Sequence, residues 1–203
     1  MTELLHYGAD PAEARRIVIG VHGRGQGAVF MRDKVAALID DPGLHWMLPE
    51  APGATWYPAQ FMEPYEANQP QLDAGLDRID ALLADAARVA EPERIAVVGF
   101  SQGACLLAHH LLTRPGIRGP VALLTGGFIG PAGTAVASSR SLAGQEVYME
   151  AADDDPWVPL VRVRETLDAL QAAGADARLD VRAGNEHHVP EPALAAVRRL
   201  LAG

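Results

Sequence analysis

Short apolar segments alternate with longer amphipathic segments along most of the chain. The expected strands are residues 16–21, 44–48, 94–100, 120–128, 146–151 and 177–183. The expected helices are residues 70–90, 102–114, 160–174 and 190–203, and the first of them has apolar side chains at helical spacing along one face. Strands joined by crossover helices form a mostly parallel sheet with helices on both faces. The pattern therefore predicts an α/β fold.

Length and composition favour one domain with a substantial core. The chain has 203 residues, of which 49% are hydrophobic, and no linker or repeat divides it, so we expect a single domain over residues 1–203. The net charge of −9 disfavours nucleic acid and anionic membranes as partners. The single cysteine, Cys105, excludes an intrachain disulfide, which is typical of a reducing compartment. Neither a secretory signal nor a membrane-spanning run is expected, so the sequence predicts a cytoplasmic protein without a membrane anchor.

A serine stands where a buried strand is expected to meet a helix. The segment GFSQG at 99–103 has the pattern G-x-S-x-G, which alone is weak in a chain with 20 glycines. Its context is more specific, because a sharp turn between strand and helix exposes a serine hydroxyl. In the alternative interpretation Ser101 only caps the helix that follows. The context favours Ser101 as a nucleophile.

A serine nucleophile needs a base, and the base needs a carboxylate that orients it. On folds of this kind the order along the chain is serine, acid and histidine. His187 and His188 lie on the loop before the last expected helix, and aspartates 153–155 directly follow the strand at 146–151. Both candidate partners therefore come after the C-terminal ends of strands, the edge at which open α/β sheets place their sites.

Four motifs follow one another along the chain: HGRG at 22–25, GFSQGA at 99–104, DDDPWVP at 153–159 and EHHV at 186–189. In order and spacing they resemble the phospholipase/carboxylesterase family of α/β-hydrolases, which includes acyl-protein thioesterases and small bacterial esterases. The resemblance covers nearly the whole chain and implies an α/β-hydrolase fold. No insertion between the motifs is long enough for a separate cap domain.

The resemblance also implies roles for individual residues. Ser101 corresponds to the nucleophile, Asp155 to the acid before Pro-x-Val-Pro, and His187 to the base. His188 stays open as the alternative base; otherwise it is a solvated loop histidine. Hydrolysis by such a triad needs no metal, and we expect no cofactor.

Two backbone N–H groups are needed to stabilise the oxyanion. One is expected from Gln102, the residue after the nucleophile, and the other from the loop after the strand at 16–21. By resemblance the second donor is the N–H of Arg24. His22, which precedes it, corresponds to a residue that orients the loop and is not a base.

Two long stretches lack an expected helix or strand, namely 49–68 and 127–145, and loops of this length are often functional. The first is rich in aromatic residues, which beside a nucleophile would form the wall of an acyl or aryl pocket. The main candidates for this wall are Trp56, Tyr57, Phe61 and Trp157, with Phe30, Met31 and Met62 as further candidates. In the alternative interpretation the aromatics only pin the loop to the surface.

The resulting hypothesis is a serine hydrolase that forms an acyl-enzyme and acts on short-to-medium acyl esters, with thioesters as the second substrate class. One rival is a lactone- or amide-cleaving hydrolase of the same fold. The other is a non-catalytic binding protein, which usually lacks a triad member. The expected partner is a small-molecule acyl ester or thioester, and the resemblance leaves a homodimer open.

Overall fold

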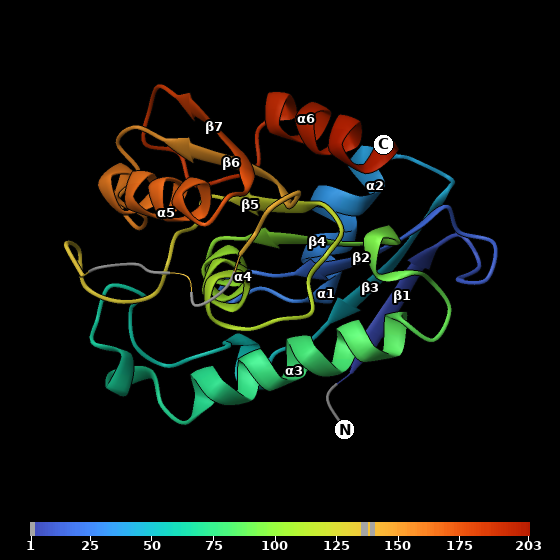
Figure 1. Cartoon of the computed structure of the whole chain (residues 1–203), viewed down its shortest axis with the longest axis horizontal. Coiled ribbons are helices and arrows are strands. Elements are labelled where there is room, and N and C mark those ends of the chain that lie inside the picture. The colour runs from blue at the N-terminus through green and yellow to red at the C-terminus, as the bar shows by residue number, and fades with distance from the viewer. Residues whose placement is uncertain (1–2, 135–137, 139–140) are drawn as a thin grey trace.

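The computed structural model describes residues 3–134, 138 and 141–203. Over these residues seven strands form one sheet in the order β1-β3-β2-β4-β5-β6-β7 (Figure 1). They are β1 Leu4–Gly8, β2 Arg16–Val21, β3 Leu44–Pro49, β4 Ile95–Phe100, β5 Val121–Leu124, β6 Glu146–Ala152 and β7 Asp176–Arg182. β1 is antiparallel to β3, and the other neighbouring strands are parallel. The expected α/β fold with a mostly parallel sheet is confirmed.

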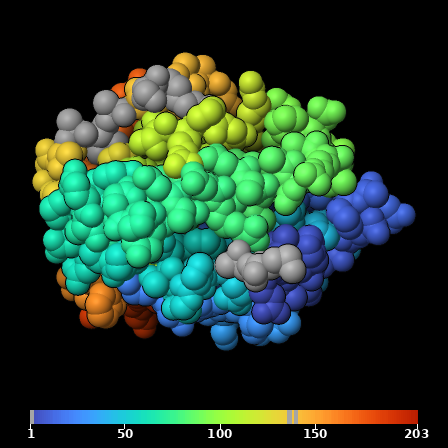
Figure 2. Space-filling view, turned by 90° about the horizontal axis from the view of Figure 1, so that it is seen from below, coloured from blue at the N-terminus to red at the C-terminus, as the bar shows by residue number. Residues whose placement is uncertain are grey.

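Helices cover both faces of this sheet. They are α1 Ala28–Met31, the π-helical turn η1 Arg32–Ala36, α2 Ala37–Ile39, α3 Gln71–Ala86, α4 Gln102–Thr113, α5 Leu160–Ala172 and α6 Glu191–Ala202. Apolar side chains of α3, α4 and α5 pack on one face, and those of α1, α2 and α6 pack on the other. In the view from below, α3 and the segment before it spread across the middle of the molecule (Figure 2).

α4 is enclosed on every side, because residues 102–112 are all buried between the sheet and the elements around it. Apart from Gln102, His109 and His110, these residues are glycine or apolar, and apolar side chains around most of the circumference are typical of a helix in such a position. Within the described residues, no helix has both the length and the apolar composition that crossing a membrane requires.

The structure contains two elements that the hydrophobic pattern did not predict. β1 is a short strand at the sheet edge, and its residues are half-buried or exposed, so it lacks a strong apolar signature. The helical segment from Ala28 to Ile39 is interrupted by η1, and the π-helical turn breaks the regular 3.6-residue spacing. Both segments therefore lack the regular spacing of apolar residues by which strands and helices are predicted from a sequence.

Two other expectations need correction. The strand expected at 120–128 covers only β5, because Thr125 has a φ of 51° and leaves the sheet. The stretch 49–68 contains two short 3-10 turns, η2 Pro52–Ala54 and η3 Tyr65–Asn68, and a third, η4 Pro92–Arg94, precedes β4. The loop expected at 127–145 lies partly outside the described residues.

Candidate active site

Ser101 occupies a sharp turn between β4 and α4. Its φ of 53° lies in the left-handed region, which residues other than glycine rarely adopt. Its amide donates to the carbonyl of Leu124 at 2.9 Å, and its own carbonyl accepts from the amide of Cys105 at 2.9 Å. The Ser101 hydroxyl forms no capping bond to α4. The hydroxyl therefore does not have the helix-cap role of the alternative interpretation.

The glycines of the motif allow β4, α4 and β2 to approach closely. A Cβ atom on Gly99 would lie 2.7 Å from the amide nitrogen of Ala104. A Cβ atom on Gly103 would lie 2.2 Å from the carbonyl oxygen of Val21. Both contacts are with backbone atoms that cannot move aside without displacing an element, so a side chain at either position would push α4 away from the sheet.

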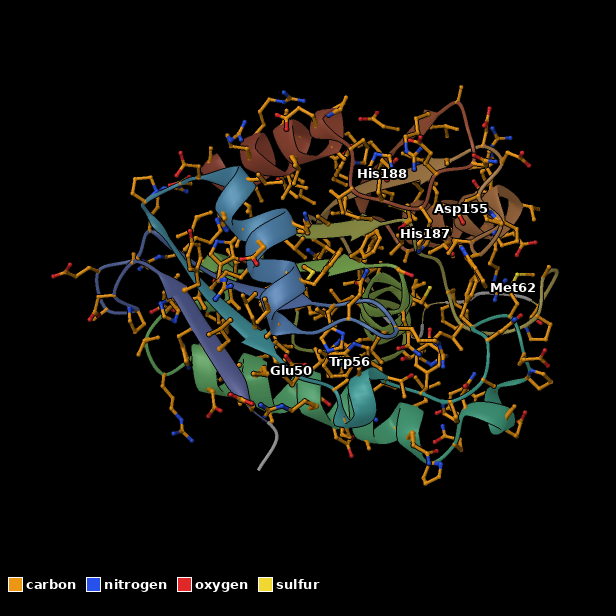
Figure 3. All side chains as sticks on the ribbon, turned by 180° about the vertical axis from the view of Figure 1, so that it is seen from behind. Glu50, Trp56, Met62, Asp155, His187 and His188 are labelled. Carbon is orange, nitrogen blue, oxygen red and sulfur yellow. The ribbon has the colours of Figure 1, made fainter. Side chains whose placement is uncertain are left out.

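His187 and Asp155 reach Ser101 from the loops that follow β7 and β6. Nδ1 of His187 lies 2.7 Å from Oδ2 of Asp155, and Nε2 lies 2.8 Å from Oγ of Ser101. Because an ionised carboxylate only accepts, Nδ1–H donates to Asp155 and Nε2 accepts from the Ser101 hydroxyl. Asp155 and His187 lie next to each other in Figure 3. The structure thus brings the three residues into one hydrogen-bonded chain.

The carboxylate of Asp155 is buried and held at both oxygens. Oδ1 accepts from the amides of Trp157 at 2.8 Å and Val158 at 3.0 Å, which leaves Oδ2 for His187. These two amides belong to the turn that follows Asp155 in the sequence DPWVP. The turn therefore fixes the carboxylate in the orientation that the imidazole requires.

His188 lies outside the hydrogen-bonded chain of Ser101, His187 and Asp155. Its side chain is 50% exposed, and Nδ1 is 3.6 Å from Oε2 of Glu186. Of the two histidines that the sequence left as alternatives, only His187 contacts Ser101 and Asp155.

The loop that carries His187 is tied back to the end of β6. Oδ1 of Asp153 accepts from the amide of Gly184 at 2.9 Å. Nε of Arg182 donates to Oε1 of Glu150 at 2.8 Å, and the same guanidinium donates to the carbonyl of Glu186. Glu150 and Arg182 were not predicted from the sequence; the available signal was the carboxyl group of Glu150 within the otherwise apolar segment VYMEA at 147–151.

Glu150 makes the stability of the fold depend on pH. Burial raises the pKa of Glu150 from 4.5 to about 7, although the neighbouring Arg182 guanidinium opposes the shift. Between about pH 4.5 and pH 7 the unfolded chain has released this proton whereas the folded protein keeps it. Since the folded state then binds more protons, this group makes stability fall as the pH rises through that window.

Replacing Glu150 by glutamine removes this titration and keeps an oxygen that can accept from Arg182. We expect the unfolding free energy of Glu150→Gln, relative to that of the wild type, to rise by about 1 to 3 kcal/mol between pH 5 and pH 8. Urea denaturation at both pH values measures this difference. Glu146→Gln changes an exposed carboxyl group on the same strand and is the matched control. If the unfolding free energies of Glu150→Gln and the wild type differ by the same amount at both pH values, the prediction is wrong.

The backbone amides of Arg24 and Gln102 have no hydrogen-bond acceptor among the described residues, and both residues line the cavity beside Ser101. The Gln102 amide is one of the N–H groups that the first turn of α4 leaves free. These are the properties expected of oxyanion donors.

His22 fixes the peptide that carries the Arg24 amide. The buried imidazole donates from Nδ1 to the carbonyl of Gly23 at 2.8 Å and accepts at Nε2 from the amide of Ala51 at 3.0 Å. Burial lowers the pKa of His22, which favours this neutral form. The Gly23 carbonyl and the Arg24 N–H belong to one trans peptide and point in opposite directions. His22 therefore sets the direction of the Arg24 N–H.

A cavity of about 420 Å³ lies beside Ser101. Its apolar lining includes Tyr57, Phe61, Phe100, Cys105, Trp157 and Val158, and its polar lining includes Arg24, Gln26, Gln60, Gln102 and His187. Three of the four main wall candidates, Tyr57, Phe61 and Trp157, thus line the cavity. Trp157 is 67% exposed and contributes to its open side.

The other wall candidates lie elsewhere. Trp56 is buried outside the cavity lining, where its indole N–H donates to the carbonyl of His22 at 2.8 Å. Phe30 stacks on Phe100, and Met31 belongs to the core on the opposite face of the sheet. Met62 is not among the residues that line the cavity and packs against the core instead. An aromatic-rich segment does not by itself distinguish the side chains of a wall from those that support it.

Cys105 lines the same cavity one helical turn beyond Ser101. Burial raises the pKa of its thiol to about 11, so the thiol stays protonated and unreactive near neutral pH. Among the described residues, no group of three or more His, Cys, Asp or Glu side chains is arranged to hold a metal ion.

Comparisons with known proteins agree with this architecture. The family model described as Phospholipase/Carboxylesterase matches residues 8–202. A phospholipase/carboxylesterase from Dyadobacter fermentans is 26% identical, with a TM-score of 0.87 and coverage of 100% of this chain and 97% of that one. No curated protein matches the sequence significantly.

Two further solved structures share the fold. A carboxylesterase from Mesorhizobium loti is 22% identical, with a TM-score of 0.75 over 100% of this chain and 94% of that one. The carboxylesterase of Bacillus cereus is 18% identical, with a TM-score of 0.76 over the same shares of the two chains. On the family match over nearly its whole length, the chain belongs to the phospholipase/carboxylesterase family and is a hydrolase of the esterase class.

Proposed function

We propose that the protein is a serine carboxylic-ester hydrolase that acts through an acyl-enzyme on short-to-medium acyl esters. The observation that carries this proposal is the hydrogen-bonded chain from Ser101 through His187 to Asp155 at the wall of a largely apolar cavity. Membership of the phospholipase/carboxylesterase family supports ester chemistry at that site.

In the first half-reaction Ser101 Oγ attacks the acyl carbonyl as Nε2 of His187 takes the hydroxyl proton. Asp155 stabilises the imidazolium through the 2.7 Å bond to Nδ1. The carbonyl oxygen becomes an oxyanion, which the N–H groups of Arg24 and Gln102 stabilise. When the tetrahedral intermediate collapses, the bond to the alkoxy oxygen breaks and Nε2–H protonates the leaving alcohol.

The second half-reaction repeats these steps with water. His187 takes a proton from water as the water oxygen attacks the acyl-serine carbonyl, and the same two N–H groups stabilise the second oxyanion. Collapse breaks the bond to Ser101 Oγ, which regains its proton from Nε2. The products are a carboxylic acid and the free enzyme.

The cavity supports an apolar acyl group of limited length. Tyr57, Phe61 and Trp157 offer aromatic surface to such a group, and a volume of about 420 Å³ lies within the range of small-ligand pockets.

A substrate panel tests the proposal. It comprises nitrophenyl esters from acetyl to dodecanoyl, the acyl thioesters of the same lengths, an anilide and a lactone. We expect the highest kcat/KM for an ester of short or medium chain, with thioesters second and the anilide and the lactone far below. A preference for the anilide or the lactone would contradict the proposed reaction.

A further inference from the structure

Two side chains from different parts of the fold, the loop after β2 and the start of α4, donate to one backbone carbonyl. Nη2 of Arg24 donates to the carbonyl of Tyr57 at 2.9 Å, and Nε2 of Gln102 donates to the same oxygen at 2.8 Å. Arg24 and Gln102 are also the residues whose backbone amides are proposed to stabilise the oxyanion. Each of the two residues therefore connects the oxyanion amides with the segment that carries Tyr57.

Arg24 holds this segment along its length. Besides Tyr57, its guanidinium donates to the carbonyl of Pro58 at 2.8 Å and to that of Ala59 at 2.6 Å. The guanidinium also lies 5.8 Å from the centre of the Tyr57 ring. A planar fork of donors can bind several carbonyls at once, whereas the ammonium group of lysine acts as a single point charge. Arginine at position 24 is thus suited to holding three successive carbonyls.

Gln102 holds the start of the same segment. Its Oε1 accepts from the amide of Trp56 at 3.0 Å, while its Nε2 donates to the Tyr57 carbonyl. The side chain is buried, so these bonds are shielded from competing water. Because Gln102 is the first residue of the enclosed helix α4, its anchor does not move independently of Ser101.

The segment so held is part of the cavity wall. Tyr57 and Phe61 line the cavity with Ser101, and residues 55–61 contain no helix or strand that would fix their backbone. Besides the bond from the amide of Gly130 to the carbonyl of Phe61 at 2.7 Å, side chains hold this segment, including Asn68, whose Oδ1 accepts from the amide of Ala59 at 2.8 Å. Loss of the Arg24 bonds would leave the wall and the Arg24 amide free to shift relative to each other.

We propose that Arg24 is a positioning and specificity-determining residue, whose side chain keeps the acyl wall at Tyr57 and Phe61 in register with the oxyanion amides. The inference rests on the proposed function and extends it. An acyl group that contacts the wall is then presented to the amides in one fixed geometry. The wall thereby affects the rate of the chemical step as well as binding.

Arg24→Met and Arg24→Lys test this inference against the nitrophenyl ester series. We expect Arg24→Met to lower kcat by about 10- to 100-fold, because small misplacements of reacting groups have effects of this size. We also expect the preference among acyl lengths to flatten, and Arg24→Lys to fall between Arg24→Met and the wild type. Arg198→Met is the matched control, since Arg198 donates to the carbonyls of Ile39 and Leu38, in a helix on the opposite face of the sheet.

A merely structural role for Arg24 predicts a different result. The folded variants would then melt at a lower temperature but keep the wild-type kcat and the wild-type preference among acyl lengths, and this outcome would overturn the inference. Should Arg24→Met fail to fold, Arg24→Lys decides between the two results by the same measurements.

Labelling of Ser101 separates this inference from the proposed function. Fluorophosphonates with short and long alkyl chains are applied to the wild type and to each variant, and labelling rates are compared. If the wild type is labelled but hydrolyses no ester, the proposed function fails, and an altered chain-length preference in labelling of the variants still supports the role of Arg24. Unaltered preference overturns that role, and absence of labelling in the wild type overturns both.

Discussion

Replacing Ser101 by alanine should lower ester hydrolysis by about 10⁴- to 10⁶-fold and abolish covalent labelling by a fluorophosphonate. The substitution removes the oxygen that lies 2.8 Å from Nε2 of His187. It leaves the two amides and the cavity in place, so we expect the variant to hydrolyse the ester slowly but still faster than water alone does. Initial rates with the best nitrophenyl ester, together with intact-protein mass spectrometry after labelling, measure both effects.

The control for this variant is a measurement that it still folds. Alanine carries the same Cβ atom as serine, so the backbone strain at a φ of 53° is unchanged. We therefore expect circular dichroism and the melting temperature of Ser101→Ala to match those of the wild type closely. Labelling that persists in the folded variant would mean that another residue is the nucleophile, and the proposed mechanism would be wrong.

Replacing His187 by alanine should have an effect of similar size, about 10⁴- to 10⁶-fold on kcat, because Ser101 then has no base. His188→Ala should stay within a few-fold of the wild type, since its half-exposed ring lies outside the hydrogen-bonded chain. The two adjacent variants are a matched pair, and measuring kcat and KM of both under identical conditions decides between them.

The pair also tests the register of the loop EHHV at 186–189, in which the resemblance makes His187 the base. Loss of activity in His188→Ala with retention in His187→Ala would mean that the loop is placed one residue out of register. Retention of activity in His187→Ala, whatever the result for His188→Ala, would contradict the assignment of His187 as the base.

The fold and the three hydrogen-bonded residues Ser101, Asp155 and His187 could be predicted from the sequence, because the patterns that indicate them are each contained in a short segment. Ser101 is bracketed by glycines at a strand-helix junction, and both the junction and the glycines are visible without a structure. Asp155 and His187 follow strands, and parallel strands bring such positions to one edge of the sheet. The choice between His187 and His188 depended on a single residue of register, which the resemblance favoured, and it is His187 whose ring nitrogens lie within hydrogen-bond distance of Ser101 and Asp155.

Other parts of the site could not be predicted because they depend on contacts between distant segments. The side chain of Gln102 contacts the hydroxyl of Thr55 and the backbone of Trp56 and Tyr57, which lie more than forty positions earlier in the sequence. Trp56 and Tyr57 are adjacent aromatics, yet one supports His22 and the other lines the cavity. Glu150 and Arg182 come from neighbouring strands. Neither periodicity nor motif spacing contains information about such pairings.

β7 lies at the edge of the described sheet, and most of its residues are exposed or half-buried. His187 follows this strand, whereas Ser101 belongs to the enclosed centre formed by β4 and α4. The candidate site thus combines a buried part of the fold with a largely exposed edge strand, and the free energy of local opening varies between such parts of a protein. The proposed reaction therefore requires β7 to be in place as well as the centre of the fold. A molecule whose edge strand has opened can retain its whole centre and still be inactive.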